Sequence, residues 1–327
     1  MTPSQNIPCQ TISWSVGDAP LQGGPVVAAI GNFDGVHRGH QQVINAAISA
    51  ARSQGHASAV ITFDPHPREF FRHDDAPFHL ADRQEKDRLL AALGVDRVIH
   101  VTFDDALRAT DAEKFVTEIL PALGVCGLFA GSDFAFGRGR GGDIDTINAL
   151  GADIGITASS VSLLADDNSA VVSSSRVRAA LQEGAPERAA DMLGHDWAIT
   201  GVVQQGDQRG RTIGFPTANI PLGSLLHPAF GVYAVRIFSA DPGTAYQLLG
   251  NGVANIGIRP TVEDRGVLCE AHLFDQQLDL YGQRLAVCLK SFIRPERKFT
   301  GIDELTDQIA KDARAARTLL PPIRQTA

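Results

Sequence analysis

The chain has 327 residues, more than one compact core usually serves, so we expect two domains. Apolar residues make up 44% of the chain and charged residues 20%; both values are ordinary for a globular protein and argue against disorder. The formal net charge of −8 disfavours a general nucleic-acid-binding surface, which is normally basic.

Cysteine usage and hydropathy predict the compartment. The cysteines are scattered and form no CxxC pair, so neither a zinc knuckle nor a disulfide framework is indicated. No stretch reaches the length of a membrane span, and the N-terminus lacks the basic and apolar regions of a signal peptide. We therefore expect a cytoplasmic protein with no membrane or nucleic-acid partner. The sequence makes no prediction of the oligomeric state.

The first half of the chain alternates between apolar runs typical of buried strands and amphipathic runs typical of helices. We expect strands at 26–30, 57–63, 97–103 and 125–130, and helices at 41–54, 84–93 and 112–123. Strands that alternate with helices are typical of a parallel sheet. This half, residues 1–185, is therefore predicted to be an α/β Rossmann-like domain.

Beyond about residue 184 the pattern changes to short apolar runs, with turn residues and no helical run between one and the next. We expect strands at 198–203, 231–238, 246–254, 269–273 and 284–292. This pattern indicates an antiparallel β-barrel or sandwich. After residue 300 an apolar stripe at helical spacing predicts a closing helix, for which Thr300 and Asp303 form an approximate capping box. Residues 186–327 are thus predicted to form an antiparallel β-barrel domain with a C-terminal helix.

A glycine-rich turn, GNFDGVHRGH at 31–40, stands between the first buried strand and the first helix. Free backbone N–H groups and the helix dipole make a helix start a natural anion site, and glycines let a phosphate approach the backbone. His37 and His40 share a helix face, so both can reach one bound group. They are helix-start residues without a role, a metal pair, or phosphate-binding residues. Phosphate binding is favoured, since no third residue stands at a spacing typical of metal ligands.

Two further segments of the first half carry polar groups at predicted strand or helix ends. In the loop 131–143, Phe134 and Phe136 are expected to pack or stack, and Asp133 to bind a ring or ribose edge. One RGG-like run in an acidic chain is poor evidence for RNA binding. The run SSSRVR at 173–178 begins a helix, where hydroxyls usually serve as caps. Two arginines behind these hydroxyls favour a loop that closes over a triphosphate.

In the second half a glycine-rich stretch at 210–219 ends in a polar pair. It is no Walker A loop, because no GK[ST] follows. Thr217 and Asn219 alternate on an extended backbone, so both side chains point to one face. A hydroxyl and an amide oxygen suit Mg²⁺ carried by a nucleotide, and a structural turn is the alternative.

Glu270 lies in a predicted strand, where alternation places it on one face with His272. A carboxylate in this position either faces solvent, which is the usual outcome, or acts as a general base for an alcohol. The residues alone favour the first interpretation.

Apart from roughly its first twenty residues, the chain resembles the bacterial bifunctional riboflavin kinase/FAD synthetase family. Its adenylyltransferase half is matched by GNFDGVHRGH at 31–40, TFDPHP at 62–67, the loop 131–143 and SSSRVR at 173–178. Its kinase half is matched by RGRTIGFPTANI at 209–220, GVYAV at 231–235, NIGIRPT at 255–261, EAHLFD at 270–275, DLYG at 279–282 and RPERKF at 294–299.

The resemblance implies two ATP-dependent reactions. In the C-terminal barrel, ATP phosphorylates the ribityl 5′-hydroxyl of riboflavin to give FMN, with Glu270 as the base; this overrides the solvent-facing interpretation. In the N-terminal domain, ATP adenylylates FMN to give FAD and pyrophosphate. There His37 and His40 bind the triphosphate and stabilise charge on the α-phosphate and the leaving pyrophosphate. Thr217 and Asn219 hold Mg²⁺, which accompanies ATP.

The resemblance also implies three sets of binding residues. The nucleotide set of the adenylyltransferase is Gly31, Asn32, Phe33, Asp34, Gly35, His37, His40, Asp133, Ser174, Ser175 and Arg178. The nucleotide set of the kinase is Gly210, Arg211, Gly214, Pro216, Thr217 and Asn219. The flavin set is Asp64, Pro65, His66, Phe134 and Arg294.

The chain departs from the family pattern at three places. Ser175 stands where threonine is usual; it keeps the hydroxyl, so activity is expected to survive. Gln276 and Gln277 stand where phenylalanine often follows Asp275, a change that bears on flavin affinity. Ala135 stands where arginine is frequent, a change that bears on the contact with the FMN phosphate.

Two other classes of protein would predict different motifs. A flavin- or nucleotide-binding regulator that has lost one activity predicts degraded motifs, yet both sets of motifs stand with conservative changes. A flavin- or NAD-dependent oxidoreductase predicts GxGxxG after the first strand, and the turn at 31–40 does not supply it. The bifunctional enzyme is therefore the favoured interpretation.

Overall fold

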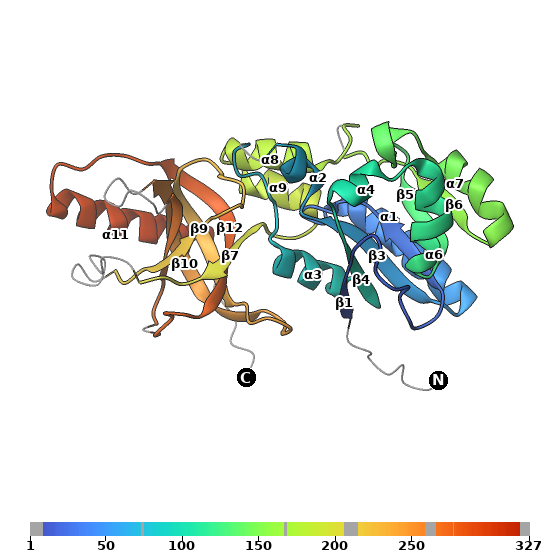
Figure 1. Cartoon of the computed structure of the whole chain (residues 1–327). Helices are drawn as coiled ribbons and strands as arrows, with labels where there is room; N and C mark the ends of the chain where they lie inside the picture. Colours follow the sequence, from blue (N-terminus) through green and yellow to red (C-terminus); the bar gives the residue numbers. More distant parts are fainter. Residues whose placement is uncertain are drawn as a thin grey trace. The chain divides into compact units, whose positions relative to one another are not determined.

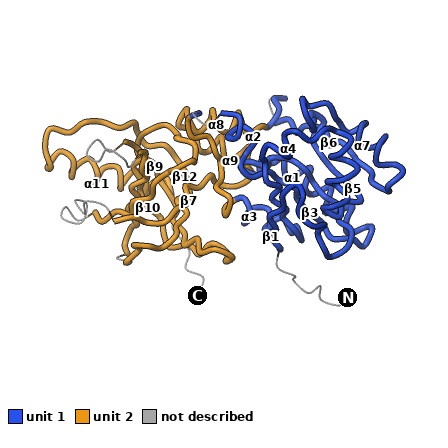
Figure 2. Tube along the Cα trace, viewed as in Figure 1, with its two compact units in different colours: residues 1–75, 86–172 blue, residues 76–85, 173–327 orange. Residues whose placement is uncertain are grey.

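The computed structural model describes residues 9–72, 75–166, 169–205, 215–258, 266–276 and 278–320. The chain forms two compact units (Figure 2). The first unit comprises Met1–Asp75 and Lys86–Val172, and the second comprises Ala76–Glu85 and Ser173–Ala327. The second unit is thus built from two separate stretches of the chain.

The first unit contains a six-stranded parallel sheet in the order β1-β4-β3-β2-β5-β6 (Figure 1). Its strands are β1 (Gln10–Trp14), β2 (Val26–Ile30), β3 (Ala57–Asp64), β4 (Arg97–Thr102), β5 (Val125–Gly131) and β6 (Thr157–Val161). Its helical segments are α1 (Arg38–Gln54), α2 (Pro67–Phe71), α3 (Arg83–Ala92, of which the first three residues belong to the second unit), α4 (Asp105–Ala109), α5 (Ala112–Lys114), η1 (Phe115–Ile119), α6 (Leu120–Ala122), η2 (Arg138–Arg140), α7 (Ile144–Gly151) and η3 (Ala152–Ile154). The predicted α/β fold is confirmed.

The central strand β2 is apolar throughout because both of its faces are covered. Val26, Ala28 and Ile30 belong to one hydrophobic cluster, and Val27 and Ala29 to another, which includes the buried side of α1. All five side chains are at most 2% exposed. A strand buried on both faces reads as a continuous apolar run, which is why the sequence pattern located it correctly.

The edges of this sheet differ from the prediction. The strands β1 and β6 were not expected, and β6 buries only Ala158 below a tenth exposure. An edge strand of mixed polarity has no strong period of its own and forms by pairing with its neighbour. The helix expected over 112–123 contains a π-helical turn, Phe115–Ile119, followed by Pro121, whose missing N–H interrupts the regular ladder.

The second unit contains a six-stranded antiparallel sheet in the order β7-β12-β9-β10-β11-β8. Its strands are β7 (Ala198–Val202), β8 (Ala218–Pro221), β9 (Gly231–Ser239), β10 (Gln247–Ile258), β11 (Val267–Leu273) and β12 (Arg284–Pro295), and its helices include α8 (Ser174–Gln182), α9 (Pro186–Leu193) and α11 (Ile302–Leu319). The backbone N–H of Gln204 donates to the carbonyl of Asn219 at 2.8 Å, just beyond β7, which brings the two edge strands together. The sheet is therefore a nearly closed barrel, as predicted.

The segment 76–85 belongs to the barrel unit because its polar groups bond there. Asp82 Oδ2 accepts a hydrogen bond from Thr200 Oγ1 at 2.6 Å and pairs with the guanidinium of Arg284. Trp197 Nε1 donates to the carbonyl of Leu80 at 2.7 Å. These contacts join residues more than a hundred positions apart, so no local pattern predicts them.

The C-terminal helix α11 covers part of one barrel face. Val232 of β9 and Val253 of β10 form a buried cluster with Ala316 and Leu320. The helix begins after Gly301, which supplies no side-chain cap, and Glu304 accepts hydrogen bonds from the N–H and hydroxyl of Thr300. The predicted capping box at Thr300 and Asp303 is thus wrong by one residue.

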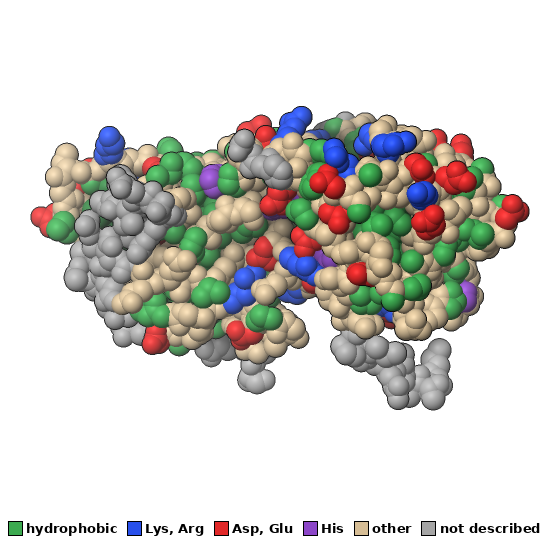
Figure 3. Space-filling model, in the orientation of Figure 1, with side chains coloured by type: hydrophobic (Ala, Val, Ile, Leu, Met, Phe, Trp, Pro, Cys, Tyr) green, Lys and Arg blue, Asp and Glu red, His purple; other side chains and the backbone are tan. Residues whose placement is uncertain are grey.

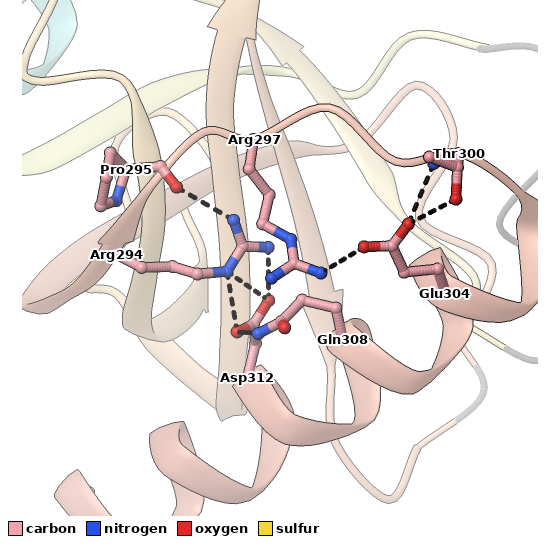
Figure 4. A network of polar contacts seen from close by, with 7 residues as sticks. All are labelled: Arg294, Pro295, Arg297, Thr300, Glu304, Gln308 and Asp312. Carbon is pink, nitrogen blue, oxygen red and sulfur yellow. Dashed lines mark hydrogen bonds and ion pairs between the residues drawn. The ribbon is translucent and has the colours of Figure 1, made fainter.

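An ion-pair network fastens this helix to the end of β12 (Figure 4). Arg294 donates to Asp312 through Nε, at 3.0 and 3.1 Å, and through Nη2 at 2.7 Å. Gln308 Nε2 donates to the same carboxylate at 2.8 Å, and Arg297 pairs with Glu304 at 2.8 Å. The Asp312 side chain is only 5% exposed, so these partners replace the water that would otherwise solvate its carboxylate.

Surface features are mixed. On the face shown in Figure 3, acidic and basic side chains are interspersed over each unit. Within the described ranges, none of the helices combines the length and apolarity needed to cross a bilayer.

Asp312→Ala should lower the free energy of unfolding of the barrel unit by about 3 kcal/mol, because it leaves the largely buried Arg294 charge uncompensated. Urea unfolding followed by Trp197 fluorescence in a Trp14→Phe background reports on this unit. The double variant Arg294→Met/Asp312→Leu is the control and should recover most of the loss. A double variant as unstable as the single one would contradict the account.

Candidate active sites

The first candidate site lies where the parallel sheet reverses its winding. The chain proceeds from β2 outward through β3 and β4, then returns to β5 on the other side of β2. In open α/β sheets ligands bind in the crevice beyond the carboxyl ends of the strands at such a reversal. The turn after β2 and the loop after β5 follow neighbouring parallel strands at this position, which makes them candidates for a shared site.

The turn after β2 is held in an unusual backbone conformation. Phe33 and Val36 have positive φ values of 48° and 44°, and Gly35 has 77°. Phe33 is 2% exposed, and its ring lies so close to Gly31 that a Cβ there would come within 3.2 Å of Phe33 Cζ. Non-glycine residues in the left-handed region are costly and persist where the surroundings enforce them, often at functional sites.

The two histidines of the turn are stacked face to face. Their ring centroids are 3.5 Å apart with 18° between the planes. His37 is the N-cap of α1, and its Nδ1 accepts the backbone N–H of His40 at 3.2 Å. Because Nδ1 is an acceptor, the proton of neutral His37 is on Nε2. His37 therefore presents a hydrogen-bond donor, which suits an anionic group.

Buried polar side chains lie next to the turn and hydrogen-bond to its backbone or to one another. Thr62 is completely buried, and its hydroxyl donates to the carbonyl of Asn32 at 3.1 Å. Lys86, 7% exposed, places Nζ 3.5 Å from the same hydroxyl, and Asp34 is 2% exposed. A buried ammonium group close to the turn adds positive potential there, which favours binding of an anion.

The loop after β5 contributes aromatic side chains. Phe134 and Phe136 stack with centroids 5.6 Å apart, and Phe136 also packs against Phe115 at 4.8 Å. Gly142 makes room for Phe136, since a Cβ there would lie 2.6 Å from the ring. The two phenylalanines, which were expected to pack or stack, therefore stack on each other, and Phe136 also packs against Phe115.

A phenylalanine cluster that the sequence analysis missed stands at the carboxyl ends of β3 and β4. Phe103 contacts Phe63, Phe70 and Phe71 with centroids 6.0, 5.3 and 5.7 Å apart. Phe71 is 59% exposed, which is unusual for so large an apolar side chain. The cluster adjoins the predicted residues Asp64, Pro65 and His66, of which His66 caps α2 by accepting the N–H of Arg68. The double phenylalanine at 70–71, which begins three positions after the end of the predicted motif at 62–67, was the available signal.

The residues Ser174, Ser175 and Arg178 lie on α8, in the second unit. The N-cap of this helix is Ser173. Arg178 Nε donates to the carbonyl of Phe78 at 2.8 Å, and its guanidinium lies over the Phe78 ring at 5.4 Å.

The second candidate site is a row of polar residues across the barrel strands. Glu270 of β11 pairs with Asn219 of β8 on one side and with Asn255 of β10 on the other. Residues directly opposite on antiparallel strands share a face, so all three side chains project together. Asn219 is 5% exposed, and its Oδ1 has no hydrogen-bond partner among the described residues. A buried acceptor in this state is expected to meet a ligand or cation.

His272, on the same face as Glu270, orients the segment before Asn219. Its Nδ1 lies 2.8 Å from the carbonyl of Pro216, which can only accept, so Nδ1 carries the proton. The ring also makes an edge contact with Phe215. The flanking Cys269 points into the barrel core, where burial and then the charge of Glu270 raise the pKa of its thiol. Glu270 thus lies on the face of β11 opposite to the one on which its neighbours Cys269 and Ala271 are buried.

Of the other predicted kinase residues, the structure places Arg294 but not the glycine-rich stretch before Pro216. In the strand register, Arg294 of β12 stands opposite Val232 of β9, which stands opposite Asn255 of β10. Arg294 is therefore two strands away from Asn255 along the same row of register partners. Its guanidinium is engaged by Asp312 rather than directed at Glu270. Gly210, Arg211 and Gly214 lie outside the described residues.

Comparison with known proteins identifies the class. Residues 20–176 match the FAD synthetase family model, and residues 193–320 match the riboflavin kinase family model. The folds and sites therefore define a two-domain, ATP-using transferase. The chain belongs to the bifunctional riboflavin kinase/FMN adenylyltransferase family.

Individual relatives agree with this. A bifunctional riboflavin kinase/FMN adenylyltransferase of Escherichia coli K12 is 41% identical over 304 residues, covering 93% of this chain and 95% of the relative. The Bacillus subtilis protein of the same name is 38% identical over 296 residues, covering 89% and 91%. A crystal structure described as a macrolide-efflux protein from Streptococcus pneumoniae is similar with a TM-score of 0.80 at 28% identity, covering 94% of this chain and 99% of that one.

The protein is therefore an enzyme with two activities, FMN adenylyltransferase in the N-terminal part and riboflavin kinase in the C-terminal part. Its substrates and products include ATP, riboflavin, FMN and FAD. Both families use ATP together with a divalent metal.

Thr62→Val should slow FAD formation from FMN about fivefold, because it removes the hydrogen bond to the Asn32 carbonyl that supports the phosphate-binding turn. Chromatography of FMN and ATP reaction mixtures measures this directly. Thr62→Ser keeps the hydroxyl and should stay close to the parent, and FMN formation should be unchanged in both variants. Equal losses in the Val and Ser variants would refute the role of the hydroxyl.

Proposed function

We propose that Glu270 is the general base of the riboflavin kinase, with Asn219 and Thr217 holding Mg²⁺ and the ATP phosphates. The observation that carries this is the pairing of Glu270 with Asn219, whose buried Oδ1 lacks a protein partner within the described ranges. Amide and hydroxyl oxygens are ligands that Mg²⁺ accepts when the nucleotide supplies the rest. When bound, the metal neutralises phosphate charge that would otherwise oppose attack by the hydroxyl.

The chemistry of phosphorylation gives Glu270 its task. The ribityl 5′-hydroxyl oxygen forms a bond to the γ-phosphorus of ATP while the bond to ADP breaks. The hydroxyl proton passes to the Glu270 carboxylate, which strengthens the nucleophile. Gly210, Arg211, Gly214 and Pro216 complete the proposed nucleotide loop.

In the adenylyltransferase, we propose that the turn 31–40 binds the ATP phosphates. An FMN phosphate oxygen bonds to the α-phosphorus as pyrophosphate leaves. The attacking oxygen is already anionic, so this reaction requires charge stabilisation rather than a base. His37 provides this stabilisation through its Nε2 donor, and His40 through the ring that stacks on it. The rest of the turn is proposed to surround the phosphates: Gly31, Asn32, Phe33, Asp34 and Gly35. Asp133, Ser174, Ser175 and Arg178 are further proposed nucleotide-binding residues of the adenylyltransferase.

The flavin of FMN is proposed to bind at the phenylalanine cluster formed by Phe63, Phe70, Phe71 and Phe103. An exposed aromatic surface is what an isoalloxazine ring stacks on. Asp64, Pro65 and His66 border the cluster, and Phe134 packs on the same hydrophobic core as Phe63 and Phe103. Arg294, tied to Asp312, is proposed to act on the kinase flavin through the position of its segment.

We assign the adenylyltransferase to residues 1–185 and the kinase to residues 186–327, in agreement with the matched ranges 20–176 and 193–320. We further propose cytoplasmic activity, since both reactions consume ATP, with small phosphorylated molecules rather than nucleic acid or membranes as partners.

Two substitutions should separate the activities. Glu270→Gln should reduce FMN formation at least about 100-fold, the scale of general-base catalysis, and leave FMN-to-FAD conversion intact. His40→Ala should reduce FAD formation about 100-fold and leave FMN formation intact. Both are measured by chromatography of each half-reaction. Loss of both activities in either variant, with the fold intact by circular dichroism, would rule out two separate sites.

Phe71→Ala should raise the KM for FMN in the adenylyltransferase about five- to tenfold, because the flavin loses an aromatic contact. The KM for ATP should not change. Ile154→Ala, which removes another apolar side chain of 46% exposure from the same unit, is the matched control. An unchanged KM for FMN in the Phe71 variant would place the flavin elsewhere.

A further inference from the structure

Asn255 stands beside the proposed base without an assigned role. It is the register partner of Glu270, and side chains directly opposite on antiparallel strands have Cβ atoms about 4.5–5.5 Å apart. Its carboxamide therefore lies next to the carboxylate that takes the proton of the ribityl hydroxyl.

Glu296 lies over this part of β10. Gly257, two residues beyond Asn255 and on the same face, makes room for it, because a Cβ at this glycine would overlap Glu296 Oε1. From that position Glu296 Oε1 accepts a hydrogen bond from Asn255 Nδ2 at 3.3 Å. The carboxylate thus reaches the Glu270 row through Asn255.

This hydrogen bond decides which way the Asn255 amide faces. An ionised carboxylate can only accept, so the NH₂ group is turned to Glu296 and Oδ1 is left as an acceptor beside Glu270. Asn255 Oδ1 is then an acceptor next to the carboxylate that is proposed to take the proton of the ribityl 5′-hydroxyl, so a ligand with donors on neighbouring atoms matches this position. A polyol chain such as the ribityl group provides them on adjacent carbons.

Glu296 is itself held in place from both sides. Arg294 binds Asp312 and Arg297 binds Glu304, so the backbone on either side of Glu296 is fastened to α11 (Figure 4). A side chain carried between two such anchors keeps its direction at low entropic cost.

We propose that Asn255 Oδ1 binds a ribityl hydroxyl next to the one that is phosphorylated, and that Glu296 is the positioning residue that orients this carboxamide. The proposal rests on the assignment of Glu270 as the base. In this proposal Asn255 and Glu296 together determine how the kinase recognises the polyol chain, whereas other residues hold ATP.

A double-mutant cycle tests the pair in the full-length enzyme. Asn255→Ala and Glu296→Ala should each raise the KM for riboflavin about three- to tenfold, the value of one neutral hydrogen bond, with little change in kcat or in the KM for ATP. Because Glu296 acts through Asn255, the double variant should be no worse than Asn255→Ala. Glu296→Gln retains an acceptor oxygen and should restore the parent KM.

Controls separate this role from a structural one. FMN-to-FAD conversion and the thermal midpoint are measured on every variant, and Asn255→Val replaces the alanine variant if the midpoint falls. Asp303→Ala, an acidic deletion at the start of α11, should leave the riboflavin KM unchanged. Independent effects that multiply in the double variant, or an unchanged riboflavin KM in the single variants, would overturn the proposal. FMN formation retained by Glu270→Gln would instead refute the base assignment, and the cycle would still report on Asn255 and Glu296.

Discussion

The pairing register of β11 is the constraint on which the kinase site depends. Glu270 shares a face with Asn219 and Asn255 because it stands opposite both in the register. Its neighbours Cys269 and Ala271 are at most 2% exposed and pack inside the barrel. A slip of one residue would place the carboxylate in the core and expose the apolar residues. The hydrophobic inner face therefore secures the position of the polar row, and core packing and the geometry of the proposed kinase site follow from one set of backbone hydrogen bonds.

The adenylyltransferase site follows a different rule. In the parallel sheet the two loops that matter come from β2 and β5, which are far apart in the chain and adjacent in the sheet. The backbone of the first loop is strained at Phe33 and Val36, and it is supported by the buried hydroxyl of Thr62. Strain held by buried support gives a rigid turn, and a rigid turn can offer preorganised donors to phosphates.

Long-range polar contacts hold the parts of the second unit together. Asp82 with Arg284 and Thr200 attaches the segment 76–85 to the barrel, and Asp312 with Arg294 attaches α11. The Asp312 side chain is 5% exposed and that of Asp82 27%, so removing a partner leaves a charge that is most costly to bury at Asp312. In the second case the same contact fixes the segment that carries Glu296. Stability and the proposed recognition of the ribityl chain are thereby connected through one arginine.

The sequence by itself determined the order of the two folds, because buried central strands such as β2 and amphipathic helices such as α1 carry strong periods. It also located the glycine-rich turn and the polar pair at Thr217 and Asn219, since special backbone conformations demand particular residues. The edge strands β1 and β6, the transfer of residues 76–85 to the barrel unit, and the phenylalanine cluster came only from the tertiary structure. So did the neighbours of Glu270: alternation predicted that it shares a face with His272, but Asn255 meets it only through cross-strand pairing. Local pattern records what a residue prefers, whereas its partners are set by hydrogen-bond register between segments distant in the chain.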